Sequence, residues 1–233
     1  MEKSVGRATP TIVVVIPALN EEPTIGIVID EIPVVELTAR GYTVRTVVVD
    51  NGSTDGTAAV AAARHAEVIH EPQRGKGTAM RRAFRQVSGD YVFMLDGDAT
   101  YPAIHIVDMV DRLAAGCDVV TGSRLRGRRC PGSISPLNVL GNHLLTWLAC
   151  FLYGHKTSDL CTGYWGFRGS VLPDLNLRSR GFNLEAELFA EVTRRRLKLC
   201  EVPVNYRRRP TPAKLRSLRD GARIARTLLT KRF

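Results

Sequence analysis

The feature that most constrains the fold is a set of short, continuous runs of apolar residues, each followed by polar residues. The first two runs are TIVVVIP at 11–17 and TVRTVVVD at 43–50. Runs without polar alternation are typical of strands buried on both faces, as in parallel sheets. Further strands are expected at 67–70, 91–96, 118–123 and 198–204. Helical stretches separate most of them, and this alternation predicts an α/β fold with a parallel sheet.

The composition is that of a globular protein, with 44% hydrophobic and 24% charged residues in a chain of 233. This length suits one large α/β domain, or a domain with an appendage. The formal charge of +10 favours anionic partners such as nucleotide diphosphates, nucleic acid or an anionic membrane surface. Aromatic residues make up 6% of the chain, and no recognition helix or RNP-like motif is present. A nucleic-acid-binding module is therefore the less favoured class, and no nucleic-acid partner is expected.

The five cysteines are scattered, and no pair has the spacing of metal ligands. This pattern predicts reduced thiols in a cytosolic protein rather than a disulfide framework or a zinc site. The first ten residues contain no apolar stretch of the kind found in secretory signals, so no such signal is expected.

The most apolar window runs from 137 to 154 and is interrupted by Asn138, Gly141, Asn142 and His143. A spanning helix needs roughly 20 mostly apolar residues, so this window is a poor membrane span. Two interpretations stay open: a helix buried in the protein, or a helix lying in a bilayer interface. After it, the stretch DLCTGYWGFR at 159–168 is expected to be irregular.

Four short segments, each of which follows an expected strand, should meet at one edge of the sheet. They lie at 17–21, 50–55, 96–98 and 123–124. In parallel sheets, ligands bind beyond the carboxyl ends of the strands. Asp96 and Asp98 are separated by one glycine, and burying like charges so close together is unfavourable without a cation. The pair predicts an oxygen-only site for Mg²⁺ or Mn²⁺, with a simple turn as the alternative.

Two other stretches predict ligand contacts. Asp50 and Asn51 can accept from or donate to the edge of a nucleobase, although an Asx turn would use the same residues. The loop RGKG at 74–77 brings two cations to a helix start, which predicts an anion cradle, with a solvated loop as the alternative. It is not a Walker loop, and no phosphate loop of a nucleotidyltransferase is visible. No G-x-G-x-x-G follows the first strand, which argues against a dinucleotide dehydrogenase.

Seven motifs then occur in order: VVVIPALNEE, VVVDNGSTDGT, RGKGTAMRRAF, YVFMLDGDATYP, TGSR, DLCTGYWGFR and EVPVNYRRR. Together they resemble the inverting family-two glycosyltransferases, most closely the dolichyl-phosphate or polyprenyl-phosphate mannose and glucose synthases. The resemblance implies the GT-A fold, a Rossmann-like nucleotide-diphospho-sugar transferase fold whose mostly parallel central sheet is flanked by helices. It also implies a single domain over 1–233, with a nucleotide-sugar-binding half at 11–124, an acceptor-binding half at 125–215 and a basic helix at 216–233.

The resemblance assigns roles to individual residues. The residues implied to bind the nucleotide sugar are Pro17, Leu19, Glu21, Asp50, Asn51, Lys76, Asp96, Gly97, Arg209 and Lys214. Those implied to be catalytic are Asp98, Arg124, Asp159 and Glu187, and the implied metal ligands are Asp96 and Asp98. A Mg²⁺ or Mn²⁺ ion would act as a Lewis acid on the departing diphosphate, with electrostatic support from Arg124, Arg209 and Lys214.

The implied reaction is the metal-dependent, inverting transfer of a sugar from a UDP- or GDP-sugar to polyprenyl or dolichyl phosphate. A lipid phosphate is already anionic and needs no base, whereas a hydroxyl acceptor would need one, from Asp159, Glu185 or Glu187. In this branch the segment equivalent to 137–153 lies against the membrane. The expectation is a cytoplasmic protein with a peripheral contact to the cytoplasmic membrane face or with a membrane-anchoring subunit. The alternative is a soluble glycosyltransferase acting on a small-molecule acceptor, such as a secondary-metabolite intermediate.

Overall fold

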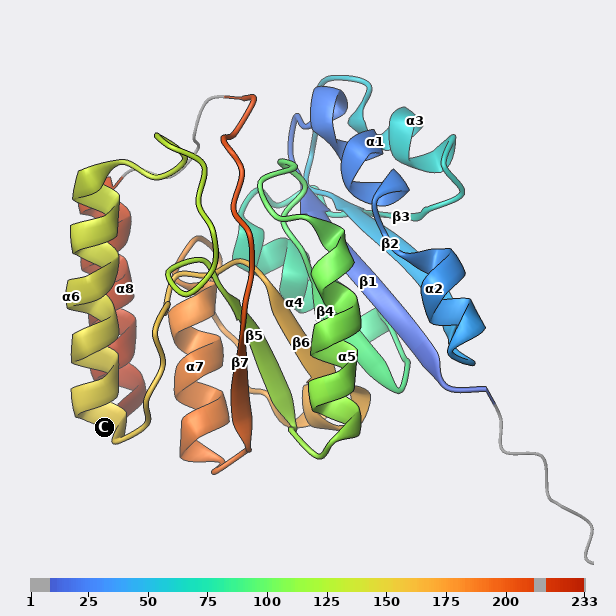
Figure 1. Cartoon of the computed structure of the whole chain (residues 1–233). Coiled ribbons are helices and arrows are strands. Elements are labelled where there is room, and N and C mark those ends of the chain that lie inside the picture. Colours follow the sequence, from blue (N-terminus) through green and yellow to red (C-terminus); the bar gives the residue numbers. More distant parts are fainter. Residues whose placement is uncertain (1–8, 212–216, 233) are drawn as a thin grey trace, which may run out of the picture.

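The computed structural model describes residues 9–211 and 217–232. Within these residues the centre is a seven-stranded sheet in the order β3-β2-β1-β4-β6-β5-β7 (Figure 1). The strands are β1 (Thr11–Ala18), β2 (Thr43–Asp50), β3 (Glu67–His70), β4 (Tyr91–Met94), β5 (Val119–Ser123), β6 (Trp165–Arg168) and β7 (Leu199–Pro203). Only β6, among these strands, runs antiparallel to its neighbours, β4 and β5. The predicted mostly parallel sheet flanked by helices is therefore confirmed, and strands from both predicted halves of the chain complete it.

Helices cover both faces of this sheet. They are α1 (Glu22–Asp30), α2 (Val34–Ala39), α3 (Thr57–Ala62), α4 (Lys76–Gln86), α5 (Ile106–Ala114), α6 (Pro136–Tyr153), α7 (Leu184–Arg194) and α8 (Ser217–Arg232). Two 3₁₀ helices, η1 (Ala103–His105) and η2 (Gly169–Asp174), follow β4 and β6.

Two hydrophobic cores explain why the sequence of β1 is continuously apolar. In β1, Ile12, Val14 and Ile16 point to one face and pack with residues of α1, α2, α3 and α5. Val13 and Val15 point to the other face and pack with residues of α4, α6, α7 and α8. All five side chains are fully buried. Because successive residues of a strand face opposite sides, a sheet covered on both faces requires an apolar residue at each position.

The expectation that 159–168 is irregular is wrong for its last four residues, which form β6. Its pattern is weak because the strand is short and contains Gly166, whose missing side chain leaves room for Phe93 and Val120 of the neighbouring strands. Trp165 lies opposite Met94 and also opposite Thr121. Since β6 is antiparallel, its first residue lies at the carboxyl ends of its neighbours. The preceding segment, 159–164, therefore reaches the edge of the sheet where ligands are expected.

The expectation that all cysteines are reduced is also corrected, because Cys117 and Cys200 form a disulfide. Cys117 lies just before β5, and Cys200 lies in β7, the parallel neighbour of β5. The two residues are 83 positions apart in the chain, so only the strand pairing brings them together. The other three cysteines are free.

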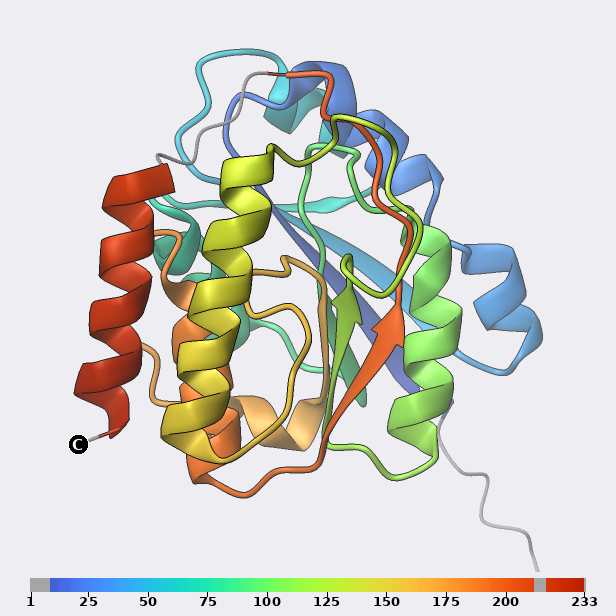
Figure 2. The same ribbon diagram turned by 60° about the vertical axis from the view of Figure 1, so that its left-hand side comes forward.

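Helix α6 corresponds to the most apolar window and combines features of both open interpretations. Asn142, Thr146 and Ala149 on its inner face are buried, and the helix packs beside α8, as Figure 2 shows. Its outer face carries a stripe of large apolar side chains that are 57–73% exposed, namely Leu137, Leu140, Leu144, Trp147 and Phe151. Within the described parts of the chain, no helix is long and apolar enough to cross a membrane.

A substitution at Gly169 tests how tightly the end of β6 is packed, and a substitution at Gly141 in α6 is the comparison. A side-chain carbon at Gly169, directly after β6, would collide with the carbonyl oxygen of Gly89. We expect Gly169→Ala to lower the free energy of unfolding by about 1–3 kcal/mol, because backbone rather than a flexible side chain must move. At Gly141 in α6 an added carbon meets nothing within 4 Å, so Gly141→Ala should raise stability by about 0.5–1 kcal/mol through helix propensity. Urea unfolding measures both, and equal effects of the two variants would contradict the packing described.

Candidate active site

A cavity of about 350 Å³ opens at the edge of the sheet where the parallel strands end. Ala18 lies opposite Asp50, and Val15 lies opposite Met94, so the exits of β1, β2 and β4 share this edge. In open parallel sheets this is the edge at which ligands bind. The lining residues are Pro17, Ala18, Leu19, Glu21, Asn51, Arg74, Gly75, Lys76, Asp96, Gly97, Asp98, Phe182 and Arg209.

The structure brings most of the predicted nucleotide-sugar-binding residues into this cavity. Those that line it are Pro17, Leu19, Glu21, Asn51, Lys76, Asp96, Gly97 and Arg209. Asp98, predicted as a metal ligand and a catalytic residue, lines it as well. Asp50 does not line the cavity, and Lys214 lies outside the described residues.

Asp50 and Asn51 organise the backbone beside the cavity. Asp50 Oδ1 accepts the N–H of Ser53 at 3.1 Å, which is the local turn contact of an Asx residue. The Asn51 side chain donates to the carbonyl of Glu71 at 3.0 Å and accepts the N–H of Gly75 at 2.6 Å. Asn51 therefore ties the end of β2 to the glycine-containing loop before α4.

A buried lysine neutralises the first carboxylate of the strand tip. Lys76 Nζ lies 2.5 Å from Asp96 Oδ1 and 2.6 Å from Glu185 Oε1. Burial alone would lower the pKa of Lys76, but the charges of Asp96 and Glu185 outweigh it, and the pKa is raised. Burial raises the pKa of Glu185 despite the opposing charge of Lys76. The lysine of the RGKG loop is thus an internal counterion as well as a cavity residue.

The second carboxylate of the strand tip, Asp98, has a different cation. Arg209 Nη1 lies 3.3 Å from Asp98 Oδ2, and Arg209 Nη2 donates to Glu21 Oε1 at 2.7 Å. Thr100 donates to Asp98 Oδ1 through its hydroxyl at 2.6 Å and its N–H at 3.1 Å. Burial and the charge of Asp96 nevertheless raise the pKa of Asp98, against the effect of Arg209. A cation shared by the two carboxylates would relieve this repulsion.

Arg124 and Asp159 form a second buried cluster. Arg124 Nη2 donates to Asp159 Oδ1 at 2.6 Å, and Arg124 Nε donates to Oδ2 at 2.7 Å, a two-point pairing. Asn142 of α6 donates to the same carboxylate at 2.6 Å. Burial alone would raise the pKa of Asp159, but the charge and hydrogen bonds of Arg124 and the bond from Asn142 lower it overall. Neither Arg124 nor Asp159 lines the cavity.

Gly163, in the segment before β6, connects the two clusters. A side-chain carbon at Gly163 would collide with the carboxylate of Asp96, so Asp96 lies directly against this backbone. The N–H of Gly163 donates to the hydroxyl oxygen of Tyr101 at 2.8 Å. Burial raises the pKa of Tyr101 well above its usual range, and the charges of Arg124, Asp159 and Asp96 also act on it. Nearby, burial raises the pKa of the Cys161 thiol to about 12.

Glu187, the remaining residue predicted to be catalytic, does not line the cavity. Its carboxylate accepts the N–H groups of Arg178 and Ser179 and pairs with Lys231. The segment that it holds continues to Phe182, which does line the cavity.

Phe182 is the cavity residue that was not predicted. Ala18 lies in the segment 17–21, which was expected at this edge of the sheet. Phe182 lies in a segment without a recognisable motif, and it is the neighbouring Ser179 and Arg180 that pack against the start of α4. Arg74 and Gly75 belong to the predicted anion cradle, and both line the cavity.

Comparison with known proteins agrees with this arrangement. The model of the family described as Glycosyl transferase family 2 matches residues 13–175. The chain therefore belongs to this family, and its predicted class, a nucleotide-sugar-dependent glycosyltransferase, is confirmed.

Individual relatives extend along nearly the whole chain. Glycosyltransferase AglJ of Haloferax volcanii is 36% identical over 93% of this chain and 70% of the relative. The Dolichyl-phosphate hexose transferase of the same organism is 32% identical over 93% of this chain and 91% of the relative. Among solved structures, glucosyl-3-phosphoglycerate synthase from Mycobacterium tuberculosis in complex with UDP superposes with a TM-score of 0.75 and 26% identity. That similarity covers 97% of this chain and 81% of the other.

Substitution of Lys76 should reveal the repulsion between the two carboxylates that it neutralises, Asp96 and Glu185. Lys76→Met leaves Asp96 and Glu185 without their shared cation, and we expect the free energy of unfolding to fall by about 3–5 kcal/mol near neutral pH. Because the pKa of Glu185 is raised in the folded state, its protonation favours folding as the pH falls. The difference in the free energy of unfolding between wild type and variant, measured by urea unfolding, should therefore shrink as the pH falls from about 7.5 to about 5.

The double variant Lys76→Met/Glu185→Gln is the control, because it removes one of the two carboxylate charges together with the lysine. It should recover part of the lost stability at neutral pH. A deficit that is the same at both pH values, or that the second substitution does not change, would contradict the role of Lys76 as a counterion.

Proposed function

We propose that the chain transfers one hexose-like sugar from a nucleotide sugar to a polyprenyl phosphate, with Mg²⁺ or Mn²⁺ bound at Asp96 and Asp98. The observation that carries this proposal is the pair of carboxylates at the tip of β4, both lining one cavity and each facing a cation from a distant segment. A cavity that combines acidic residues with basic ones suits a metal-bound diphosphate, because both signs of charge find partners there.

The residues at the strand tip fit a divalent cation of this kind. Within the described residues no group of three or more His, Cys, Asp or Glu side chains is arranged to hold a metal ion. Mg²⁺ and Mn²⁺ commonly bind through one or two carboxylates and take their other ligands from water and substrate phosphates. When bound, such an ion would stabilise the negative charge that develops on the leaving diphosphate.

The donor would lie along the β1 and β2 exits, beside Pro17, Leu19 and Asn51. Lys76, Arg74 and Arg209 line the same cavity and would face its diphosphate. A uridine nucleotide is supported by the structures of glucosyl-3-phosphoglycerate synthase, described in complex with Mn²⁺ and UDP-glucose. GDP-sugars remain the alternative donors to be compared in the assay.

The state of the acidic residues favours an anionic acceptor over a hydroxyl. A hydroxyl needs a general base whose pKa lies near the working pH. Asp159 is paired with Arg124, which lowers its pKa, and Glu185 is paired with Lys76. Asp159 is therefore a poor proton acceptor, and neither Glu185 nor Glu187 lines the cavity, whereas a phosphate nucleophile needs no base. In this proposal Arg124 and Asp159 orient the acceptor side, and Glu187 supports the segment that carries Phe182.

A lipid acceptor is further supported by the outer face of α6. Trp147 and Phe151 stack on each other with ring centroids 5.6 Å apart and are 66% and 73% exposed. Such an apolar face beside basic residues is suited to the interface of an anionic membrane. The relative named Dolichyl-phosphate hexose transferase is consistent with this acceptor class. The second candidate is a small phosphorylated acceptor, favoured by the structures of glucosyl-3-phosphoglycerate synthase with phosphoglyceric acid.

Removing Asp98 tests the metal-dependent step. Asp98→Ala should lower kcat/KM for Mn²⁺-dependent sugar transfer by about 100-fold or more, since it deletes a group that acts on the developing charge. Asp174→Ala, which removes an exposed carboxylate away from the cavity, is the matched control and should retain activity. Release of UDP from UDP-glucose, with and without Mn²⁺, is the measurement. Full activity of Asp98→Ala would refute the proposal.

Product analysis and an α6 variant together separate the two acceptors. A phosphate-linked lipid product is acid-labile, so mild acid should release the sugar from polyprenyl phosphate presented in anionic vesicles. Trp147→Glu/Phe151→Glu should lower this transfer by about ten-fold but leave transfer to a short, water-soluble prenyl phosphate unchanged, because only vesicle contact is lost. Val35→Glu, at an 87% exposed apolar site on α2, is the matched control. Transfer to phosphoglyceric acid and to no lipid acceptor would favour the second candidate.

A further inference from the structure

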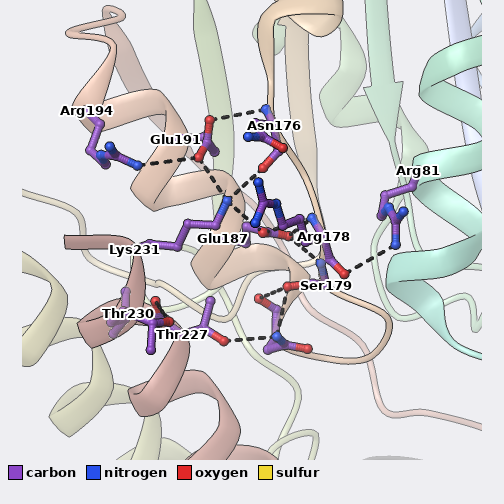
Figure 3. Close-up of polar contacts among 12 residues, drawn as sticks. Arg81, Asn176, Arg178, Ser179, Glu187, Glu191, Arg194, Thr227, Thr230 and Lys231 are labelled. Carbon is purple, nitrogen blue, oxygen red and sulfur yellow. Dashed lines mark hydrogen bonds and ion pairs between the residues drawn. The ribbon is translucent and has the colours of Figure 1, made fainter. Parts of the chain in front are cut away.

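Two buried carboxylates on α7 share one lysine from α8 (Figure 3). Glu187 and Glu191 lie one helical turn apart and are only 1% and 4% exposed. Like charges at this spacing repel each other, and burial removes the water that would solvate them. Lys231 Nζ lies 2.9 Å from Glu187 Oε1 and 3.0 Å from Glu191 Oε1, and it donates to the carbonyl of Asn176 at 2.7 Å. Its three hydrogens therefore all have acceptors within the protein.

Other cations near this cluster are weaker partners. Arg194 and Arg195 approach Glu191 at 3.9 Å and 3.4 Å, but their side chains are 52% and 39% exposed. Solvent weakens ion pairs at such positions. The Lys231 side chain is 16% exposed. Within the described residues, it is the cation that both carboxylates share.

The two carboxylates hold the backbone of the segment 176–179. Glu187 accepts the N–H of Arg178 at 2.9 Å and that of Ser179 at 2.7 Å. Glu191 accepts the N–H of Asn176 at 3.2 Å. A carboxylate accepts such bonds best while it is ionised. Burial alone would raise the pKa of Glu191, but the hydrogen bonds from Lys231 and Asn176 and the charge of Lys231 lower it overall.

The same segment lies against the first turn of α4. The carbonyl of Arg180 accepts the N–H of Thr78 at 3.2 Å, and a side-chain carbon at Gly77 would collide with the carbonyl of Ser179. Lys76, the counterion of Asp96, is in that turn, and it lines the cavity together with Phe182. A chain of direct contacts thus links Lys231 to one wall of the cavity.

We propose that Lys231 is a positioning residue for the nucleotide-sugar cavity. Its charge neutralises Glu187 and Glu191, which hold the 176–179 backbone, and this fixes the wall formed by Phe182 and the start of α4. The identity of the ligand, a nucleotide sugar, rests on the proposed function, whereas the positioning of the cavity wall by Lys231 does not. Without the ammonium group, the two carboxylates would repel each other, and the segment would loosen. Donor binding then weakens while turnover of bound donor is retained, because Lys231 contacts no cavity residue directly.

Lys231→Met in the full chain tests this proposal. We expect the dissociation constant of UDP with Mn²⁺ and the KM for UDP-glucose to rise by about ten-fold, with kcat changed by less than about two-fold. Amide hydrogen exchange should increase at 176–183 and also at 76–80, as expected for local loosening. Lys231→Arg keeps a cation and should restore wild-type values. Lys231→Met/Glu191→Gln removes one of the repelling charges and should recover part of the loss.

Two controls separate positioning from general stability. Arg232→Met removes an exposed charge from the same turn of α8 and should leave binding and exchange unchanged. Leu37→Ala creates a cavity in the core on the opposite face of the sheet. It should lower the melting temperature without weakening UDP binding, when all variants are assayed well below their melting temperatures.

Exchange that rises only within α7 and α8 would overturn the proposal, and so would UDP binding that Leu37→Ala weakens as much as Lys231→Met. A wild-type chain that binds no nucleotide sugar would refute the proposed function instead. In that case the exchange comparison would still decide whether Lys231 fixes the segment beside α4.

Discussion

The structure depends on neutralising two carboxylates at the tip of a buried strand. Asp96 and Asp98 are separated by one residue, and each has a cation from elsewhere in the chain: Lys76 from the start of α4, and Arg209 from the segment after β7. Water cannot solvate these charges as it would at an exposed position, so the cations must be held in place by the fold. The site and the packing of α4 and the post-β7 segment are therefore parts of one arrangement.

The main features of the fold could be predicted because they follow from burial. A sheet covered on both faces requires continuous apolar runs, and β1 and the second half of β2 show them. The meeting of the strand exits at one edge then follows from the parallel direction of the strands. β6 could not be predicted in the same way, because it is four residues long and its pairing with β4 is antiparallel. The Cys117–Cys200 disulfide likewise depends on the neighbourhood of β5 and β7, which no spacing in the sequence reveals.

For the site, it was easier to predict which residues take part than which residues contact one another. Arg124 and Asp159 were both expected in the active site, but their pairing was not. Arg124 directly follows β5, and the antiparallel direction of β6 brings the preceding Asp159 back to that end of β5. Asn51 was expected to face a nucleobase, and it lines the cavity while its amide also holds the loop before α4. Hydrogen bonds between loops depend on which loops meet in the fold, and the sequence motifs do not show this.

The partners of Arg209 indicate what a bound donor has to change. Its guanidinium contacts Glu21 and Asp98, so an oxygen of Asp98 that would face a metal ion already faces a cation. Two cations cannot both occupy the close side of one carboxylate without repulsion. In the proposed function, a diphosphate would resolve this conflict, because it would offer Arg209 new acceptors and bring the negative charge that a divalent ion requires. Metal and nucleotide binding would then depend on each other, with Arg209 as the residue that changes partner.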